Sequence, residues 1–186
     1  MKLFRIGLLP LLLMILTLAS QPGAIAVALP KNPPPTPIAA PVRLQIPSIE
    51  LDALIEAVGQ TASGQMGVPA DVDNVAWYEP GTTPGEQGNA VISGHLDDPK
   101  GPTVFWNLRK LKVNDQVIVV DAAGIKHTFA VIGKESYADD KAPLDQIFGF
   151  DLERDLNLIT CDGVWNNKAH QYTQRLVVYT RLVTSK

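Results

Sequence analysis

Eight short runs of β-forming residues, separated by turn-forming segments, constrain the fold of this 186-residue chain more than any other feature. The runs are rich in Val, Ile, Leu, Tyr and Thr, and they span residues 42–48, 53–59, 74–79, 90–96, 116–123, 127–137, 156–161 and 175–184. Only two short stretches, 104–111 and 142–149, favour a helix. Many strands with so little helix predict an all-β barrel or sandwich.

Two connections have the composition of turns. The sequence DAAG at 121–124 joins two strongly apolar runs and predicts a β-hairpin. The segment EPGTTPGEQGN at 79–89 predicts a long loop, because proline and glycine interrupt it repeatedly.

The N-terminal segment has the character of an export signal. Lys2 and Arg5 precede an apolar stretch at 6–19, and no acidic residue occurs before Glu50. The stretch is shorter than the roughly 18 apolar residues typical of a membrane span, and small residues at 24–28 offer a cleavage site. We expect residues 1–29 to be a signal peptide or an N-terminal membrane anchor, and either one places the remainder outside the cytoplasm.

Residues 30–41 hold six of the 15 prolines and have no core-forming pattern, so we expect an extended proline-rich spacer. Residues 42–186 then form one domain, long enough for a sizeable core. The first 40 residues contain three of the 16 basic residues and none of the 19 acidic ones, which leaves the exported part with a net charge of about −6. This charge argues against nucleic acid as a partner.

Cys161 is the only cysteine, so the chain cannot form an intramolecular disulfide. A lone thiol outside the cytoplasm is buried and inert, paired between chains, or kept for its reactivity. A reactive thiol needs a nearby histidine and a group that stabilises the charge on the attacked carbonyl.

Three histidines are available as partners. His127 lies within a strand-like run, where a structural position is the simpler interpretation, and His170 lies in a polar loop. His95 follows Gly94 at the end of a predicted strand. If that strand runs parallel to the strand ending at Cys161, His95 and Cys161 emerge at the same end of the sheet.

Hairpin geometry places Arg175 beside Cys161. The runs 156–161 and 175–184 are consecutive, so an antiparallel pair sets the end of the first opposite the start of the second. Arg175 could donate two hydrogen bonds to a carbonyl oxygen. The alternative is that it caps a strand edge in solvent.

Asp97 and Asp98 are hard ligands, but the sequence offers no matching cluster elsewhere. We therefore expect neither a catalytic metal nor another cofactor.

These residues, in this order, resemble the sortase family of membrane-associated cysteine transpeptidases from bacterial cell surfaces. The family pattern TLxTC appears as NLITC, with Asn157 in place of the first Thr, and the histidine occurs in SGH at 93–95. The arginine opens the last predicted strand at Arg175. The likeness covers nearly all of residues 42–186 and is greatest to class F.

The resemblance implies a closed eight-stranded barrel with one or two short helices and a groove for a sorting peptide, commonly of LPxTG type. Cys161 would attack the peptide's Thr carbonyl, and an amine from a cell-wall precursor or another surface protein would resolve the thioacyl-enzyme. His95 would carry protons, Arg175 would hold the carbonyl oxygen or the peptide, and Thr160 would line the groove. We expect a monomer that needs no cofactor.

Two other function classes stay open at this point. One is a purely hydrolytic thiol peptidase or another wall-modifying transpeptidase, although the sequence around the cysteine is not papain-like and lacks the SHGC arrangement of L,D-transpeptidases. The other is a non-catalytic surface-binding β-barrel in which Cys161 is buried.

Overall fold

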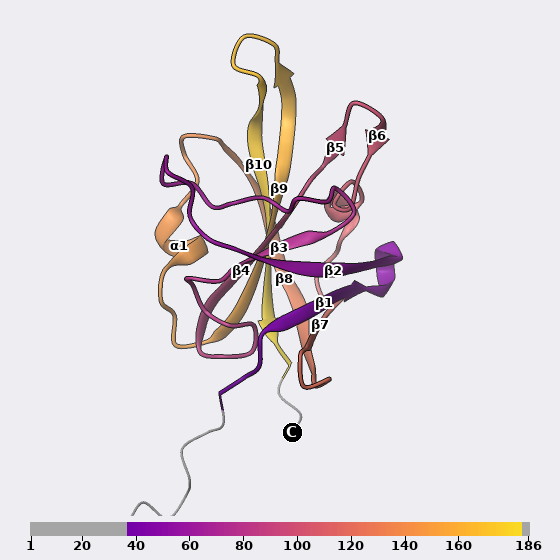
Figure 1. Ribbon diagram of the computed structural model, residues 1–186, viewed down its shortest axis with the longest axis vertical. Coiled ribbons are helices and arrows are strands. Elements are labelled where there is room, and N and C mark those ends of the chain that lie inside the picture. The colour runs from indigo at the N-terminus through magenta and orange to yellow at the C-terminus, as the bar shows by residue number, and fades with distance from the viewer. Residues whose placement is uncertain (1–36, 184–186) are drawn as a thin grey trace, which may run out of the picture. The chain divides into compact units, whose positions relative to one another are not determined.

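Eight strands close into a barrel in the computed structural model, which describes residues 37–183 (Figure 1). Around the barrel they are β1 (Pro41–Ile46), β2 (Leu51–Val58), β3 (Val75–Tyr78), β4 (Gly88–Gly94), β9 (Arg154–Asn166), β10 (Gln171–Leu182), β8 (Lys126–Ala138) and β7 (Gln116–Asp121). The pairs β2–β3 and β4–β9 are parallel, and the other pairs are antiparallel. The prediction of a closed eight-stranded barrel is confirmed, and each predicted run overlaps one barrel strand.

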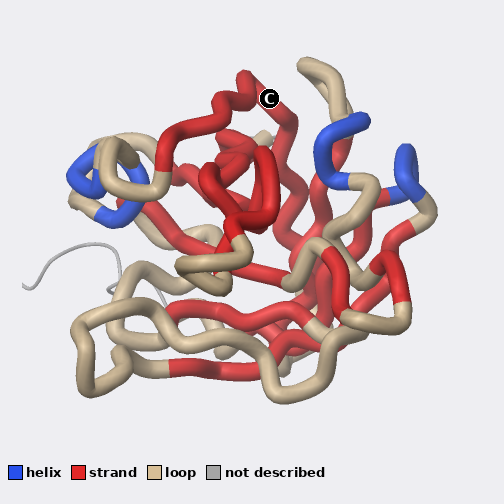
Figure 2. Tube along the Cα trace, turned by 90° about the horizontal axis from the view of Figure 1, so that it is seen from above, coloured by secondary structure: helices blue, strands red, loops and turns tan. Residues whose placement is uncertain are grey.

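The core of the barrel follows the two-residue period of its strands. Alternate side chains of β1 and β7 point inward, so Leu44, Ile46, Val117 and Val119 have no exposed surface. Seen from above, the strands form the body of the domain and the helical segments lie at its periphery (Figure 2). The DAAG segment joins β7 to β8 as an antiparallel hairpin, as predicted.

Of the two predicted helices, one forms and one does not. The stretch 142–149 contains α1 (Leu144–Phe148). The stretch 104–111 is instead a series of turns that ends in a 3₁₀ segment, η2 (Leu108–Lys110). A second 3₁₀ segment, η1 (Pro47–Ile49), follows β1.

The buried residues of the 104–111 stretch explain the difference. Phe105, Leu108 and Leu111 are fully buried at a spacing of three, which matches the three residues per turn of a 3₁₀ segment. The backbone N–H of Phe105 donates to the carbonyl of His95, so it is drawn toward the end of β4.

Two features project beyond the barrel at the end where β4 stops. The β9–β10 hairpin extends upward in Figure 1, and the short ladder of β5 (Asp97–Asp98) with β6 (Gly101–Pro102) rises beside it. The sequence did not predict this ladder, because each of its strands has only two residues. The hairpin projects beyond the pair Cys161 and Arg175, and the ladder begins two residues after His95.

The predicted leader, residues 1–29, and most of the predicted spacer lie outside the described residues. Strand β1 already begins at Pro41, the last residue of that spacer. Within residues 37–183, no helix combines the length and the apolar character that crossing a membrane requires.

Candidate active site

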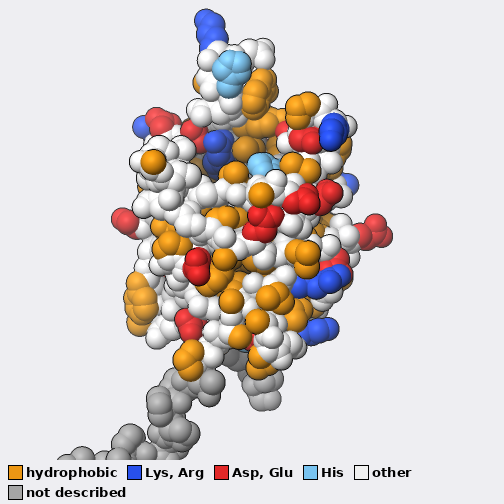
Figure 3. Space-filling model, viewed as in Figure 1, with side chains coloured by type: hydrophobic (Ala, Val, Ile, Leu, Met, Phe, Trp, Pro, Cys, Tyr) orange, Lys and Arg blue, Asp and Glu red, His pale blue; other side chains and the backbone are white. Residues whose placement is uncertain are grey.

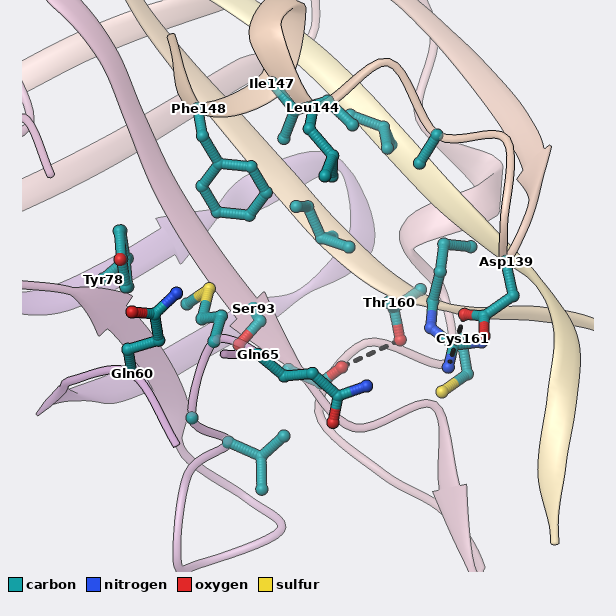
Figure 4. A pocket seen from close by; sticks show the side chains of 18 of the residues that line it. Gln60, Gln65, Tyr78, Ser93, Asp139, Leu144, Ile147, Phe148, Thr160 and Cys161 are labelled. Carbon is teal, nitrogen blue, oxygen red and sulfur yellow. Dashed lines mark hydrogen bonds and ion pairs between the residues drawn. The ribbon is translucent and has the colours of Figure 1, made fainter. Parts of the chain in front are cut away.

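A cavity of about 640 Å³ opens beside the end of the β4–β9 ladder. Its lining includes Cys161, His95 and Arg175, together with Thr160. The β2–β3 connection forms one wall, and the segment from β8 through α1 forms the other (Figure 4). The space-filling view shows hydrophobic side chains beside a basic side chain and a histidine below the protruding hairpin (Figure 3).

The parallel pairing of β4 with β9 brings the first two of these residues together. Ser93 is in register with Ile159, so two residues further along His95 and Cys161 lie at the same end of the β4–β9 ladder. The hydroxyl of Thr160 donates a hydrogen bond of 2.9 Å to the carbonyl of Gly94. This bond joins the residues that immediately precede Cys161 and His95.

The antiparallel pairing of β9 with β10 brings in Arg175, which is directly opposite Cys161. Its Nη1 donates to the carbonyls of Tyr172 at 3.1 Å and Gln174 at 2.9 Å. Its Nη2 lies 2.9 Å from Oδ1 of Asp139, and the side chain is 27% exposed. Arg175 is thus held in the cavity wall and does not extend into solvent.

The environment of Cys161 favours the protonated thiol. Burial raises the pKa of Cys161, the positive charge of Arg175 lowers it, and the negative charges of Asp97 and Asp139 raise it again, with a net increase. The side chain is only partly buried and lines the cavity, so it differs from a thiol that fills a core. A base is therefore needed to generate the thiolate for attack.

His95 is the histidine that lines the cavity. Its Nε2 lies 3.4 Å from the carbonyl oxygen of Pro69. A proton on Nε2 would donate to that carbonyl, which leaves Nδ1 as the acceptor. His127 instead contacts Asp121, with 3.0 Å between Nε2 and Oδ2, and His170 lies in the turn between β9 and β10.

Sequence analysis missed the role of Asp97 and Tyr172. The Tyr172 hydroxyl donates a 2.5 Å hydrogen bond to Oδ2 of Asp97, and this carboxylate and burial raise the pKa of Tyr172 to about 12. The Tyr172 ring meets Trp165 edge to face, with centroids 5.4 Å apart. Asp97 therefore joins the segment after His95 to the β9–β10 hairpin, whereas Asp98 accepts hydrogen bonds from two backbone N–H groups of its own turn.

The rest of the cavity is largely apolar. Tyr78 and Phe148 meet edge to face at 5.7 Å between centroids, and Ile147 of α1 is buried in a cluster with Val91 and Val177. Asn157, the departure from the family pattern, is buried and donates a 2.8 Å hydrogen bond to the carbonyl of Ile147. This residue therefore attaches α1 to β9, a contact that the sequence pattern did not reveal.

The family model that describes the sortase domain matches residues 44–183. The chain belongs to the sortase family. Family membership implies a cysteine transpeptidase of cell-surface proteins that works outside the cytoplasm. A comparison with curated proteins finds no match.

Solved structures with the same fold are sortases of low sequence identity. In its complex with MTSET, sortase C1 of Streptococcus agalactiae is 24% identical, with a TM-score of 0.61 over 79% of this chain and 71% of that one. Sortase A from Corynebacterium diphtheriae is 20% identical, with a TM-score of 0.60 over 81% and 63%. Sortase C from Clostridium perfringens SM101 is 21% identical, with a TM-score of 0.58 over 80% and 72%.

The geometry of this sortase is suited to acyl transfer. A thiol, an imidazole and a guanidinium line the cavity together with mostly apolar surface. Such a surface can hold an extended peptide while the guanidinium faces a reacting carbonyl.

Proposed function

We propose that this sortase cleaves a sorting-signal peptide of LPxTG type and transfers the acyl part to an amine of the cell surface. The observation that carries the proposal is that Cys161, His95 and Arg175 share one cavity whose lining is largely apolar. Thr160 contributes to the same lining, beside the nucleophile.

In the first step, the sulfur of Cys161 attacks the threonine carbonyl carbon and its proton passes to His95. Negative charge gathers on the carbonyl oxygen, where N–H groups of Arg175 stabilise it. The carbon–nitrogen bond then breaks, and His95 returns the proton to the departing amine. The peptide beyond threonine leaves, and a thioester remains on Cys161.

In the second step, an amine attacks the thioester, loses a proton to His95 and expels the thiol. A new amide forms, so the net reaction is transpeptidation. The amine comes from a cell-wall precursor or from another surface protein, and water replaces it slowly when no amine is present. No step needs a cofactor.

The setting of the enzyme is also part of the proposal. Residues 1–29 bring the catalytic domain to the membrane or direct its secretion, and residues 30–41 hold it away from that surface. The domain acts as a monomer on other surface proteins. Its class is class F, an assignment that the resemblance of the sequence segments around the site supports.

Intact-mass measurement of the full-length protein with LPxTG-type peptides tests the proposal. We expect an acyl adduct on Cys161 that hydroxylamine converts to a threonine hydroxamate. A free carboxylate as the only product, at every amine concentration, would favour the hydrolytic thiol peptidase. A thiol that iodoacetamide modifies only after unfolding would favour the non-catalytic barrel.

A further inference from the structure

The cavity wall contains a carboxylate that the reaction above does not use. Asp139 directly follows β8, where the chain leaves the barrel toward α1. Its Oδ1 lies 2.9 Å from Nη2 of Arg175, and Figure 4 shows it beside Cys161. We propose that Asp139 is a positioning residue that holds the Arg175 guanidinium in the orientation required for the peptide carbonyl. This inference rests on the proposed function, because it concerns the same reaction.

Asp139 is itself fixed to the strand that carries Arg175. Its backbone N–H donates to the carbonyl of Thr173 at 3.2 Å. The side-chain amide of Gln171 donates to its second oxygen, Oδ2, at 3.3 Å. Since each carboxylate oxygen has its own partner on β10, the carboxylate keeps a defined position relative to the guanidinium.

A count of donors shows why this arrangement supports catalysis. A guanidinium has five N–H groups. Nη1 of Arg175 uses both of its own on the carbonyls of Tyr172 and Gln174, and Nη2 faces Asp139. Among the described residues, no hydrogen bond engages the Nε N–H or the N–H groups of Nη2, although Nη2 is ion-paired with Asp139. Asp139 therefore orients the fork and leaves donors for a carbonyl oxygen.

Asp139 also affects the nucleophile, where its negative charge opposes formation of the thiolate. After burial, which is the largest cause, and against the effect of Arg175, its negative charge raises the pKa of the Cys161 thiol. Removal of this charge should make the thiol more reactive toward a small reagent and less reactive toward a peptide. A residue that only stabilises the fold would not change the two reactions in opposite directions.

The experiment compares Asp139→Asn with Asp140→Asn in the full-length chain. Asp140 is a matched control, because its side chain is 78% exposed and, within residues 37–183, forms an ion pair only with the neighbouring Lys141 at 3.3 Å. For Asp139→Asn we expect acylation by a fluorogenic LPxTG-type peptide to fall about tenfold or more, since small misplacements of catalytic groups are costly. Labelling by iodoacetamide at pH 7 should become faster. Asp140→Asn should change neither rate by more than about twofold.

A double variant tests whether Asp139 acts through Arg175. In an Arg175→Ala background, Asp139→Asn should change the acylation rate by less than about twofold, because the group that it positions is absent. Two results would overturn this role. One is acylation by Asp139→Asn at or above the wild-type rate. The other is a loss of acylation in the Arg175→Ala background as large as the loss that Asp139→Asn causes alone. A wild-type protein that never forms the thioester overturns the proposed function itself, which keeps the two failures distinct.

Discussion

The hydroxyl of Thr160 and the carbonyl of Gly94 are joined by a 2.9 Å hydrogen bond, and Thr160 is only 3% exposed. Each residue immediately precedes a member of the proposed catalytic pair, Cys161 in one case and His95 in the other. The bond therefore fixes the end of the parallel β4–β9 ladder, where the side chains of His95 and Cys161 must meet. Thr160 lines the cavity, but its hydroxyl is already engaged by the protein.

Thr160→Val should weaken both the fold and the reaction. Valine keeps the shape of threonine but cannot donate, so the buried carbonyl of Gly94 loses a partner at a cost of about 1–2 kcal/mol in the free energy of unfolding. We expect acylation by the peptide to fall about tenfold or more, because the end of β4 is no longer hydrogen-bonded to β9 beside Cys161. Urea unfolding and peptide kinetics measure the two effects.

The matched control is Thr160→Ser, which keeps the hydroxyl and loses a methyl group. It should retain acylation close to the wild-type rate at a stability cost of about 1 kcal/mol. Equal acylation rates for the serine and valine variants would show that the hydrogen bond does not position the pair.

Gly94 has no side chain, which allows its backbone to lie close to the ring of Phe105. A Cβ on Gly94 would lie 2.7 Å from Cδ2 of Phe105, which is fully buried. We expect Gly94→Ala to lower the free energy of unfolding by about 1–3 kcal/mol, because the ring cannot move without disturbing the core. Gly133→Ala is the control, since its Cβ would meet nothing within 4 Å. Equal urea midpoints for the two variants would contradict this account.

The sequence was sufficient for the parts of the site that strand patterns determine. Runs of β-forming residues and turn composition define β4, β9 and β10, and hairpin connectivity then sets Arg175 opposite Cys161. The parallel pairing of β4 with β9 was only a condition in the sequence argument. The structure supplies it, together with the Thr160–Gly94 bond that maintains it.

The remaining contacts depend on side chains that loops bring together from distant positions. Asp97 and Tyr172 are 75 residues apart, and no local pattern indicates their hydrogen bond. Asp139 lies in the exit from β8, where composition indicates only a loop. Phe105 and Leu108 have a spacing that fits an α-helix or a 3₁₀ segment, so the outcome depends on tertiary packing.

Labelling of Cys161 should have a midpoint above the ordinary thiol pKa. Iodoacetamide reacts with the thiolate, so a raised pKa leaves less reactive species at neutral pH and the rate climbs as pH rises. Arg175→Ala removes a positive charge that lowers the pKa, so its midpoint should shift to higher pH. The rate of labelling as a function of pH provides the measurement. A midpoint that moves to lower pH in Arg175→Ala would contradict the assigned sign.

The phenol of Tyr172 should report on its link to Asp97. The carboxylate accepts the phenolic proton and disfavours the phenolate, which raises the pKa of Tyr172 to about 12. Asp97→Asn should lower that pKa toward its ordinary value of about 10, as followed by NMR of the ring carbon signals with Tyr172→Phe for assignment. Asp98→Asn is the control, because Asp98 binds backbone N–H groups of its own turn. An unchanged titration in Asp97→Asn would exclude the link in solution.

Cys161→Ala and His95→Ala should each abolish the acyl adduct while the fold persists. Cys161 is the only thiol, so its removal eliminates the nucleophile. Without His95, the thiol whose pKa burial raises loses the base that accepts its proton. Mass spectrometry measures the acyl adduct, and circular dichroism shows whether the fold persists. Near-normal turnover in either variant would contradict the proposed chemistry.

The positive charge of Arg175 and the planar geometry of its guanidinium make separate contributions to the acylation rate. A fixed donor that meets the developing oxyanion typically contributes on the order of 10²- to 10³-fold in rate, so Arg175→Ala should lose at least that much. Arg175→Lys keeps the charge but cannot hold the carbonyls of Tyr172 and Gln174 as the planar fork does, and we expect little recovery of acylation. Iodoacetamide labelling, which involves no carbonyl of a peptide, should change far less in the lysine variant.

Arg181→Lys provides the control for this comparison. Arg181 lies further along β10, where it forms two 2.9 Å hydrogen bonds with Asp155 and does not line the cavity. Its replacement should leave the acylation rate within about twofold of wild type, because no group in the cavity contacts it. If Arg175→Lys restored most of the activity, positive charge alone would explain the contribution of Arg175. If Arg175→Ala acylated at the wild-type rate, Arg175 would be a structural residue of the strand edge.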